Sequence, residues 1–231
     1  MLYDVVGPVI VGPSSSHTAG MAKIGRAFYS IFNGEIEKVI FYLNEPLYSS
    51  FKGHGSDRAL LGGILGLKES DEMIKKSIEL AINSGIEYSF ISKSFFGKHP
   101  NTVRIHGENK YKSLILEGSS IGGGAIIINE IENQNVNLTG AYPALIIKNK
   151  DVPGALVSIL SILRSGNVNI SNLSLIRSDK INKIAICVIE LDAKPLSNII
   201  EKIKDLTVVF EVSFMKELEV DLWDSTTLFA K

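Results

Sequence analysis

Hydroxyl and imidazole side chains are concentrated in one short stretch near the start of this 231-residue chain. Apolar residues spaced by three and four predict that a helix follows directly, over 19–32. Ser and Thr before a helix cap its free N–H groups, and the positive end of the helix dipole favours an anion there. The stretch therefore predicts a carboxylate or phosphate site, or else a helix whose hydroxyls serve only its own backbone. Five consecutive residues carry these groups: Ser14, Ser15, Ser16, His17 and Thr18.

A second imidazole, His54, lies between two glycines in 51–57. Glycine neighbours remove bulk and let a ligand approach, so this loop predicts a presented imidazole. A loop histidine bonded to a carbonyl is the alternative. Asp57 either orients His54 or caps a helix that begins at Arg58, and capping is the simpler role.

A polar turn follows at His99-Pro100-Asn101-Thr102. Pro100 fixes the turn and keeps the residue before it out of a helix. We expect His99 to stabilise the turn and Asn101 to donate a hydrogen bond to a substrate or a partner chain. The glycine-rich segment 118–124 predicts either a hinge or a close approach of backbone to ligand.

Composition limits the possible classes of protein. The net charge is −1 and no basic stripe is present, which argues against nucleic-acid binding. No run of 18 apolar residues or secretory signal is evident, so we expect a cytoplasmic protein that crosses no membrane. The single cysteine, Cys187, lies in an apolar stretch and cannot by itself hold a zinc or iron–sulfur site.

The helices and strands expected around these polar stretches indicate an α/β domain over 1–140. Polar residues 130–140 mark its boundary. Two helices are expected, at 58–67 and 71–84, the second stopped by Gly85. Alternating apolar residues predict the strands. These strands are 35–43, 86–90, 103–106, 111–116 and 125–128.

A second domain is predicted over 144–217, followed by a tail at 218–231 that contains Trp223. Its pattern is βαββαβ, the order of a ferredoxin-like unit, so the whole chain is α+β. The strands are 144–147, 168–177, 183–191 and 207–212, and the helices are 155–165 and 195–204.

This second domain resembles the ACT domain, a module that senses small molecules and often binds amino acids. The turn Asp151-Val152-Pro153-Gly154 and the helix after it carry the likeness. Four motifs of the first domain, in order, resemble the beta chain of the iron–sulfur L-serine dehydratase, whose first domain is similar to an allosteric substrate-binding domain. The motifs are SSSHTAG at 14–20, KGHGSD at 52–57, HPNT at 99–102 and SSIGGG at 119–124.

The resemblance implies an L-serine ammonia-lyase subunit that converts L-serine to pyruvate and ammonia and feeds gluconeogenesis. A separate alpha chain would hold the 4Fe-4S cluster, so no metal ligand is expected in this chain. It implies His17 and His54 as catalytic residues and an effector at Asp151 and Gly154, between paired ACT domains of two copies. The implied substrate-binding residues are Ser14, Ser15, Ser16, Thr18, Gly55, Ser56, Asp57 and Asn101.

Two other functions are compatible with parts of the chain. One is a purely regulatory, amino-acid-sensing subunit without catalytic residues. The other is a regulatory fragment of an NAD-dependent dehydrogenase, which the missing GxGxxG unit argues against.

Overall fold

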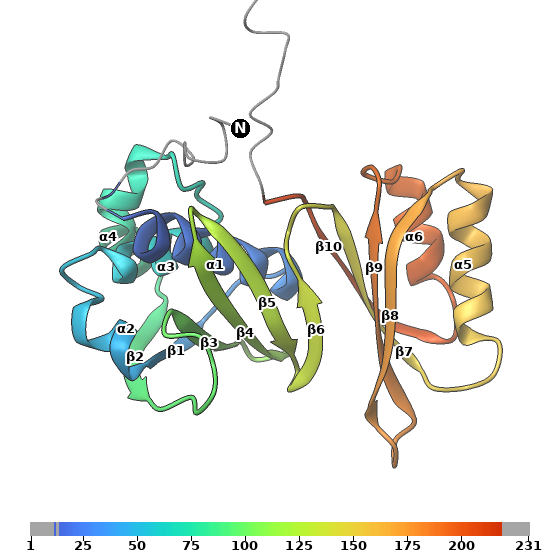
Figure 1. Ribbon diagram of the computed structural model, residues 1–231. Helices are drawn as coiled ribbons and strands as arrows, with labels where there is room; N and C mark the ends of the chain where they lie inside the picture. Colours follow the sequence, from blue (N-terminus) through green and yellow to red (C-terminus); the bar gives the residue numbers. More distant parts are fainter. Residues whose placement is uncertain (1–11, 13, 219–231) are drawn as a thin grey trace, which may run out of the picture.

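The computed structural model describes residue 12 and residues 14–218, which form two lobes, each built on one β-sheet (Figure 1). Helices α1, α3 and α4 belong to the first lobe, and helices α5 and α6 cover the outer face of the second (Figure 1). The side chains of Ser15 and Ser16 lie outside the described part. Trp223 and the rest of the predicted tail beyond Leu218 also lie outside it.

The first sheet has six strands in the order β2-β1-β3-β4-β5-β6. Strands β1 and β2 are parallel, and all other neighbours are antiparallel. The parallel pair is joined by helices α2 (Glu45–Ser50), α3 (Ser56–Ile64) and α4 (Ser77–Asn83), with a 3-10 turn at Glu72–Lys76. The strands are β1 Lys38–Asn44, β2 Glu87–Lys93, β3 Thr102–Glu108, β4 Ser113–Gly122, β5 Ala125–Ile131 and β6 Gln134–Leu138.

Helix α1 (Gly20–Phe32) is the centre of the first lobe, because it packs on both the sheet and helix α3. Two glycines let the helix backbones touch. A Cβ on Gly63 would lie 2.4 Å from the Ala22 carbonyl oxygen and 2.7 Å from the Cα of Gly25. A side chain at either glycine would force the two helices apart.

The second sheet has the order β10-β7-β9-β8, which is the ferredoxin-like arrangement predicted from the βαββαβ pattern. Helices α5 (Ala155–Ser165) and α6 (Ser197–Lys204) cover one face. Ile147, Cys187 and Ile189 point into the core beneath them. The strands are β7 Ala144–Lys150, β8 Ile170–Asp179, β9 Ile184–Leu191 and β10 Val209–Met215.

The other face of the second sheet packs against the first lobe. Ile146, Ile186 and Val188 belong to the same apolar cluster as the core around α1. The Ser213 hydroxyl, on β10, donates a 2.6 Å hydrogen bond to the carbonyl of Ile31 near the end of α1. The end of α1 is therefore bound directly to the second domain.

The predicted α+β class is confirmed, and the differences are local. Helix α2 and strand β6 were missed, and the expected helix 71–84 is divided into a 3-10 turn and α4, which ends at Asn83 shortly before Gly85, the predicted stop. Helix α3 begins two residues before Arg58 and ends at Ile64. The segment 118–124, which was predicted to be a hinge or a close approach of backbone to ligand, lies largely in strand β4, and Ser120 is fully buried there. Among residues 12 and 14–218, no helix is long and apolar enough to span a membrane.

Candidate active site

Two histidines from separate motifs meet at the start of helix α1. The ring centroids of His17 and His54 are 4.7 Å apart, with the rings tilted by 31°. Thr18, which is buried, donates a 3.1 Å hydrogen bond from its hydroxyl to the His54 carbonyl. Because α1 and α3 cross with their backbones in contact, the loop before α3 is brought to the turn before α1. The sequence predicted both histidines as site residues but not their contact.

The surroundings of the two rings differ. His17 is half-buried, and burial followed by the charge of neighbouring His54 lowers its pKa. His54 is exposed, with Nδ1 lying 3.2 Å from the carbonyl oxygen of Ser50. A carbonyl only accepts hydrogen bonds, so this contact requires a proton on Nδ1. In neutral His54, Nε2 is then the basic nitrogen.

A π-helical turn, Ser15–Ala19, precedes α1 where the sequence predicted a plain helix start. Ser14 Oγ accepts the backbone N–H of His17 at 3.2 Å and lies 3.1 Å from His17 Nδ1. The N-cap of α1 itself is Ala19, whose side chain makes no capping hydrogen bond. Ser14 therefore caps the π-helical turn that leads into α1, as one of the two alternatives predicted, whereas the Thr18 hydroxyl binds the His54 carbonyl and caps no helix.

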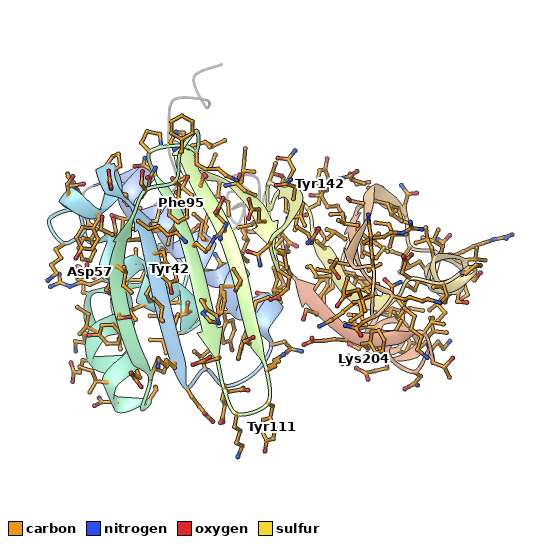
Figure 2. The ribbon with its side chains drawn as sticks, turned by 90° about the horizontal axis from the view of Figure 1, so that it is seen from below. Tyr42, Asp57, Phe95, Tyr111, Tyr142 and Lys204 are labelled. Atoms are coloured by element: carbon orange, nitrogen blue, oxygen red, sulfur yellow. The ribbon has the colours of Figure 1, made fainter. Side chains whose placement is uncertain are left out.

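The second motif supplies the first turn of α3. Gly55 is the N-cap in the left-handed conformation, with φ of 72°. Asp57 lies inside the first turn, where its Oδ1 accepts the N–H of Arg58 at 2.8 Å, and Figure 2 shows it at the edge of the first lobe. Ser56 is fully buried, and within the described part of the chain its hydroxyl has no hydrogen-bond partner. The structure therefore places Asp57 at the helix start, and within residues 14–218 no hydrogen bond joins its carboxylate to His54.

Hydrogen bonds join the third motif, HPNT at 99–102, to the fourth, SSIGGG at 119–124. The backbone N–H of Ser120 donates to the Asn101 carbonyl at 3.0 Å. The Thr102 hydroxyl donates to the His99 carbonyl at 2.7 Å and lies 2.8 Å from Ser119 Oγ. His99 Nδ1 in turn accepts the N–H of Asn101 at 3.1 Å, which confirms its predicted role in stabilising the turn.

Ser120 connects this pair of motifs to the first. A Cβ on Gly20 would lie 2.0 Å from Ser120 Oγ, so only glycine permits this approach at the start of α1. Ser120 Oγ is also buried without a hydrogen-bond partner in the described residues. The four motifs, far apart in sequence, thus form one continuous region. The sequence assigned no role to Ser120, although its position in a serine- and glycine-rich motif was a usable signal.

Comparison with known proteins identifies the family of this chain. Residues 4–131 match the family described as "Serine dehydratase beta chain", and residues 144–208 match the ACT domain. The chain is 35% identical to the probable L-serine dehydratase beta chain of Bacillus subtilis, with 92% of this chain and 96% of that protein covered. This chain belongs to the serine dehydratase beta chain family.

Two further relatives differ in length. The L-serine dehydratase beta chain of Peptoniphilus asaccharolyticus is 38% identical, over 84% of this chain and 88% of that one. The L-serine dehydratase of Helicobacter pylori (strain J99) is 30% identical, but the match covers 56% of this chain and 33% of that longer protein. The two beta chains therefore align with most of this chain, whereas the longer Helicobacter pylori protein aligns with about half of it.

The donor atoms of this serine dehydratase beta chain do not suit an iron–sulfur cluster. Cys187 is buried in β9, and burial raises the pKa of its thiol to about 12, which disfavours the thiolate that iron requires. Among the described residues, no group of three or more His, Cys, Asp or Glu side chains is placed to hold a metal ion. A cluster does not fit on the described part of this chain.

In the predicted effector loop of the ACT domain, the Asp151 carboxylate is paired with Arg177, and Gly154 has open space around it. Asp151 Oδ2 lies 2.7 Å from Arg177 Nε, so its carboxylate already has a cationic partner. Gly154 is the N-cap of α5 with φ of 86°, and no atom lies within 4 Å of the position that a Cβ would take. An ammonium group at Asp151 would have to compete with Arg177.

Proposed function

We propose that this chain is the beta subunit of a cytoplasmic L-serine ammonia-lyase, which deaminates L-serine to pyruvate and ammonia and so feeds gluconeogenesis. The observation that carries the proposal is the contact between His17 and His54, where two separate motifs meet at the start of α1. Membership of the serine dehydratase beta chain family supports the same reaction. A 4Fe-4S cluster would be held by a separate alpha chain, and this chain alone would be inactive.

His54 is our candidate for the base that removes the α-proton of serine. This proton is weakly acidic, so its removal needs a positioned base. Nδ1 of His54 faces the Ser50 carbonyl, which leaves Nε2 as the basic nitrogen on an exposed ring. The exposed position gives Nε2 access to a substrate bound between this chain and an alpha chain.

His17 has the complementary role of a neutral hydrogen-bond donor. Its lowered pKa keeps the ring uncharged near neutral pH. Ser14 Oγ accepts the backbone N–H of His17, and its own proton can then donate to Nδ1, which leaves a proton on Nε2. We propose that this N–H and the groups around it bind the substrate carboxylate. Those groups are the proposed binding residues Ser15, Ser16, Thr18, Gly55, Ser56, Asp57 and Asn101.

The domain division is part of the same proposal. We assign 1–140 to the substrate domain and 144–217 to the ACT domain, and we propose that ACT domains of two copies pair side by side. An amino-acid effector would then bind at Asp151 and Gly154, after displacing Arg177 from the carboxylate.

Replacing His54 tests the catalytic proposal. The chain is co-expressed with its alpha partner without oxygen, and pyruvate formation from L-serine is measured for His54→Gln and for the control His106→Gln, which changes a half-buried strand histidine. We expect His54→Gln to lower kcat by about 100-fold or more, since this is the usual contribution of a general base. We expect His106→Gln to retain activity. If His54→Gln changed only the response to an effector, the chain would be a purely regulatory subunit.

A further inference from the structure

A cavity of about 320 Å³ lies between the two domains, away from the candidate active site. One of its sides is formed by the end of α1 and by residues of the first sheet, and the other by strands β7, β9 and β10. Its wall contains apolar side chains that are each at least nine-tenths buried, namely Ile31, Phe32, Ile131, Ile146 and Ile186. The volume is at the small end of the range for ligand pockets, about 300–1,000 Å³, so it suits a small metabolite.

Charged groups of both signs lie around the same cavity. Lys112 Nζ, from the first domain, lies 2.7 Å from Glu211 Oε1 on β10 and 5.1 Å from the centre of the Phe32 ring. Lys148, on β7, is exposed and has no charged partner among the described residues. Glu132 uses one carboxylate oxygen, Oε1, to accept the Ile115 N–H at 2.9 Å.

We propose that this interdomain cavity binds a free α-amino acid with an aliphatic side chain. The ammonium of Lys148 matches an α-carboxylate, and the carboxylate of Glu132 matches an α-ammonium group. The buried isoleucines offer an apolar wall to the side chain. Glu211 is already paired with Lys112, so an anion without an amino group would leave Glu132 without a cationic partner and is a poorer match than an amino acid.

The cavity also has a mechanical link to the candidate active site. Helix α1 has 13 residues and is therefore about 20 Å long, with the π-helical turn of His17 at its start and Ile31 and Phe32 at its end. Ser213 fixes the Ile31 carbonyl to β10. A ligand held between β7 and the end of α1 therefore contacts the element that carries the site. The binding proposal itself does not rest on the proposed function, because it is measured without catalysis.

Calorimetry on the full chain with L-isoleucine, L-valine, glycine and L-serine tests the proposal. We expect L-isoleucine and L-valine to bind, and glycine to bind at least tenfold more weakly, since it buries no side chain. We expect Lys148→Gln and Glu132→Gln each to weaken L-isoleucine binding about tenfold or more. Glu132→Gln keeps an acceptor oxygen for the Ile115 N–H, so it preserves the fold while removing the charge.

Lys150→Gln is the matched control, because Lys150 is an exposed lysine two residues further along β7 and does not line the cavity. Three outcomes would overturn the proposal. The first is no heat with any of the four amino acids. The second is an equal loss of affinity in Lys150→Gln and Lys148→Gln. The third is binding that survives both cavity variants and is lost in Asp151→Asn, which would place the ligand at the ACT loop. Equal affinity for glycine and L-isoleucine would overturn the aliphatic specificity.

Discussion

Glycines and ion pairs of the two domains can be compared by what surrounds them. In the first, Gly20 lies against Ser120 and Gly63 lies against the backbone of α1. In the second, Gly154 stands before α5 with open space around it. Gly20 and Gly63 therefore mark close approaches and Gly154 marks a turn, and Gly55, the N-cap of α3 in the first domain, is as open as Gly154. What distinguishes them is the partner element, which comes from a distant part of the chain.

Ion pairs show the same contrast. Glu117, on β4, is completely buried and pairs with Arg104 at 2.7 Å and with Lys98 at 2.9 Å. Asp151 and Arg177 also lie 2.7 Å apart, but the Arg177 side chain is 68% exposed. Water screens the second pair more strongly than the first, so equal distances imply unequal contributions to stability.

The largest predicted effect comes from breaking the buried pair. Glu117→Ala leaves Arg104 and Lys98 with Glu130 as their remaining acidic partner in this network. Removing one partner of a buried ion pair costs about 3–5 kcal/mol, and since Glu130 compensates in part we expect about 3 kcal/mol. Urea denaturation measures the change in the free energy of unfolding.

Glu117→Gln is the control for this variant, because it keeps two polar atoms at the same place and should cost less. A loss under about 1 kcal/mol in Glu117→Ala would show that the network is effectively solvated, and the contrast between the domains would fail.

A smaller loss is expected where α1 crosses α3. In Gly63→Ala the new methyl group would meet the backbone of α1 on two sides, and backbone yields less readily than the end of a side chain. Overpacking of this kind costs about 1–3 kcal/mol, and we expect about 2 kcal/mol by urea denaturation. The contact between His17 and His54 should loosen as well, because the crossing positions both.

Gly62→Ala is the matched control on the same helix. Its Cβ would meet Ile74 Cγ1 at 3.1 Å, a side chain that can shift, and alanine favours the helix by up to about 1 kcal/mol. We expect a change of less than about 1 kcal/mol. If both variants lost the same stability, the crossing would not be the reason.

Local patterns were sufficient to predict most of the fold. The βαββαβ order of the second domain and the stop of α4 at Gly85 depend on periodicity and on glycine, both of which act over a few residues. Strand β6 was missed because its sequence, Gln134–Leu138, is polar and its pairing with β5 is what makes it a strand. Tertiary pairing overrides local propensity there.

The candidate site was only partly predictable. The types of His17 and His54 pointed to chemistry, but the meeting of the two rings depends on the crossing of α1 and α3. The opposite surroundings of the rings, and the buried hydroxyl of Ser120, come from packing that no local pattern contains. Asp57 was predicted to cap a helix that begins at Arg58, but α3 begins at Ser56 with Gly55 as its N-cap, and Asp57 lies inside the first turn, where it accepts the Arg58 N–H.

The smallest predicted effect belongs to the exposed pair. Arg177→Gln removes the partner of Asp151, and exposed pairs contribute only about 0.2–1 kcal/mol. We expect a loss of about 0.5 kcal/mol in urea denaturation, close to that of Lys180→Gln in the neighbouring turn. A loss above about 2 kcal/mol would mean that this pair, too, is structural.

Arg177→Gln also leaves the Asp151 carboxylate free. If that carboxylate receives the ammonium group of an effector, the variant should bind the effector more tightly, since Arg177 no longer competes. If the effector bound Arg177→Gln no more tightly, Asp151 would not be its binding group, and Gly154 would serve only the turn before α5.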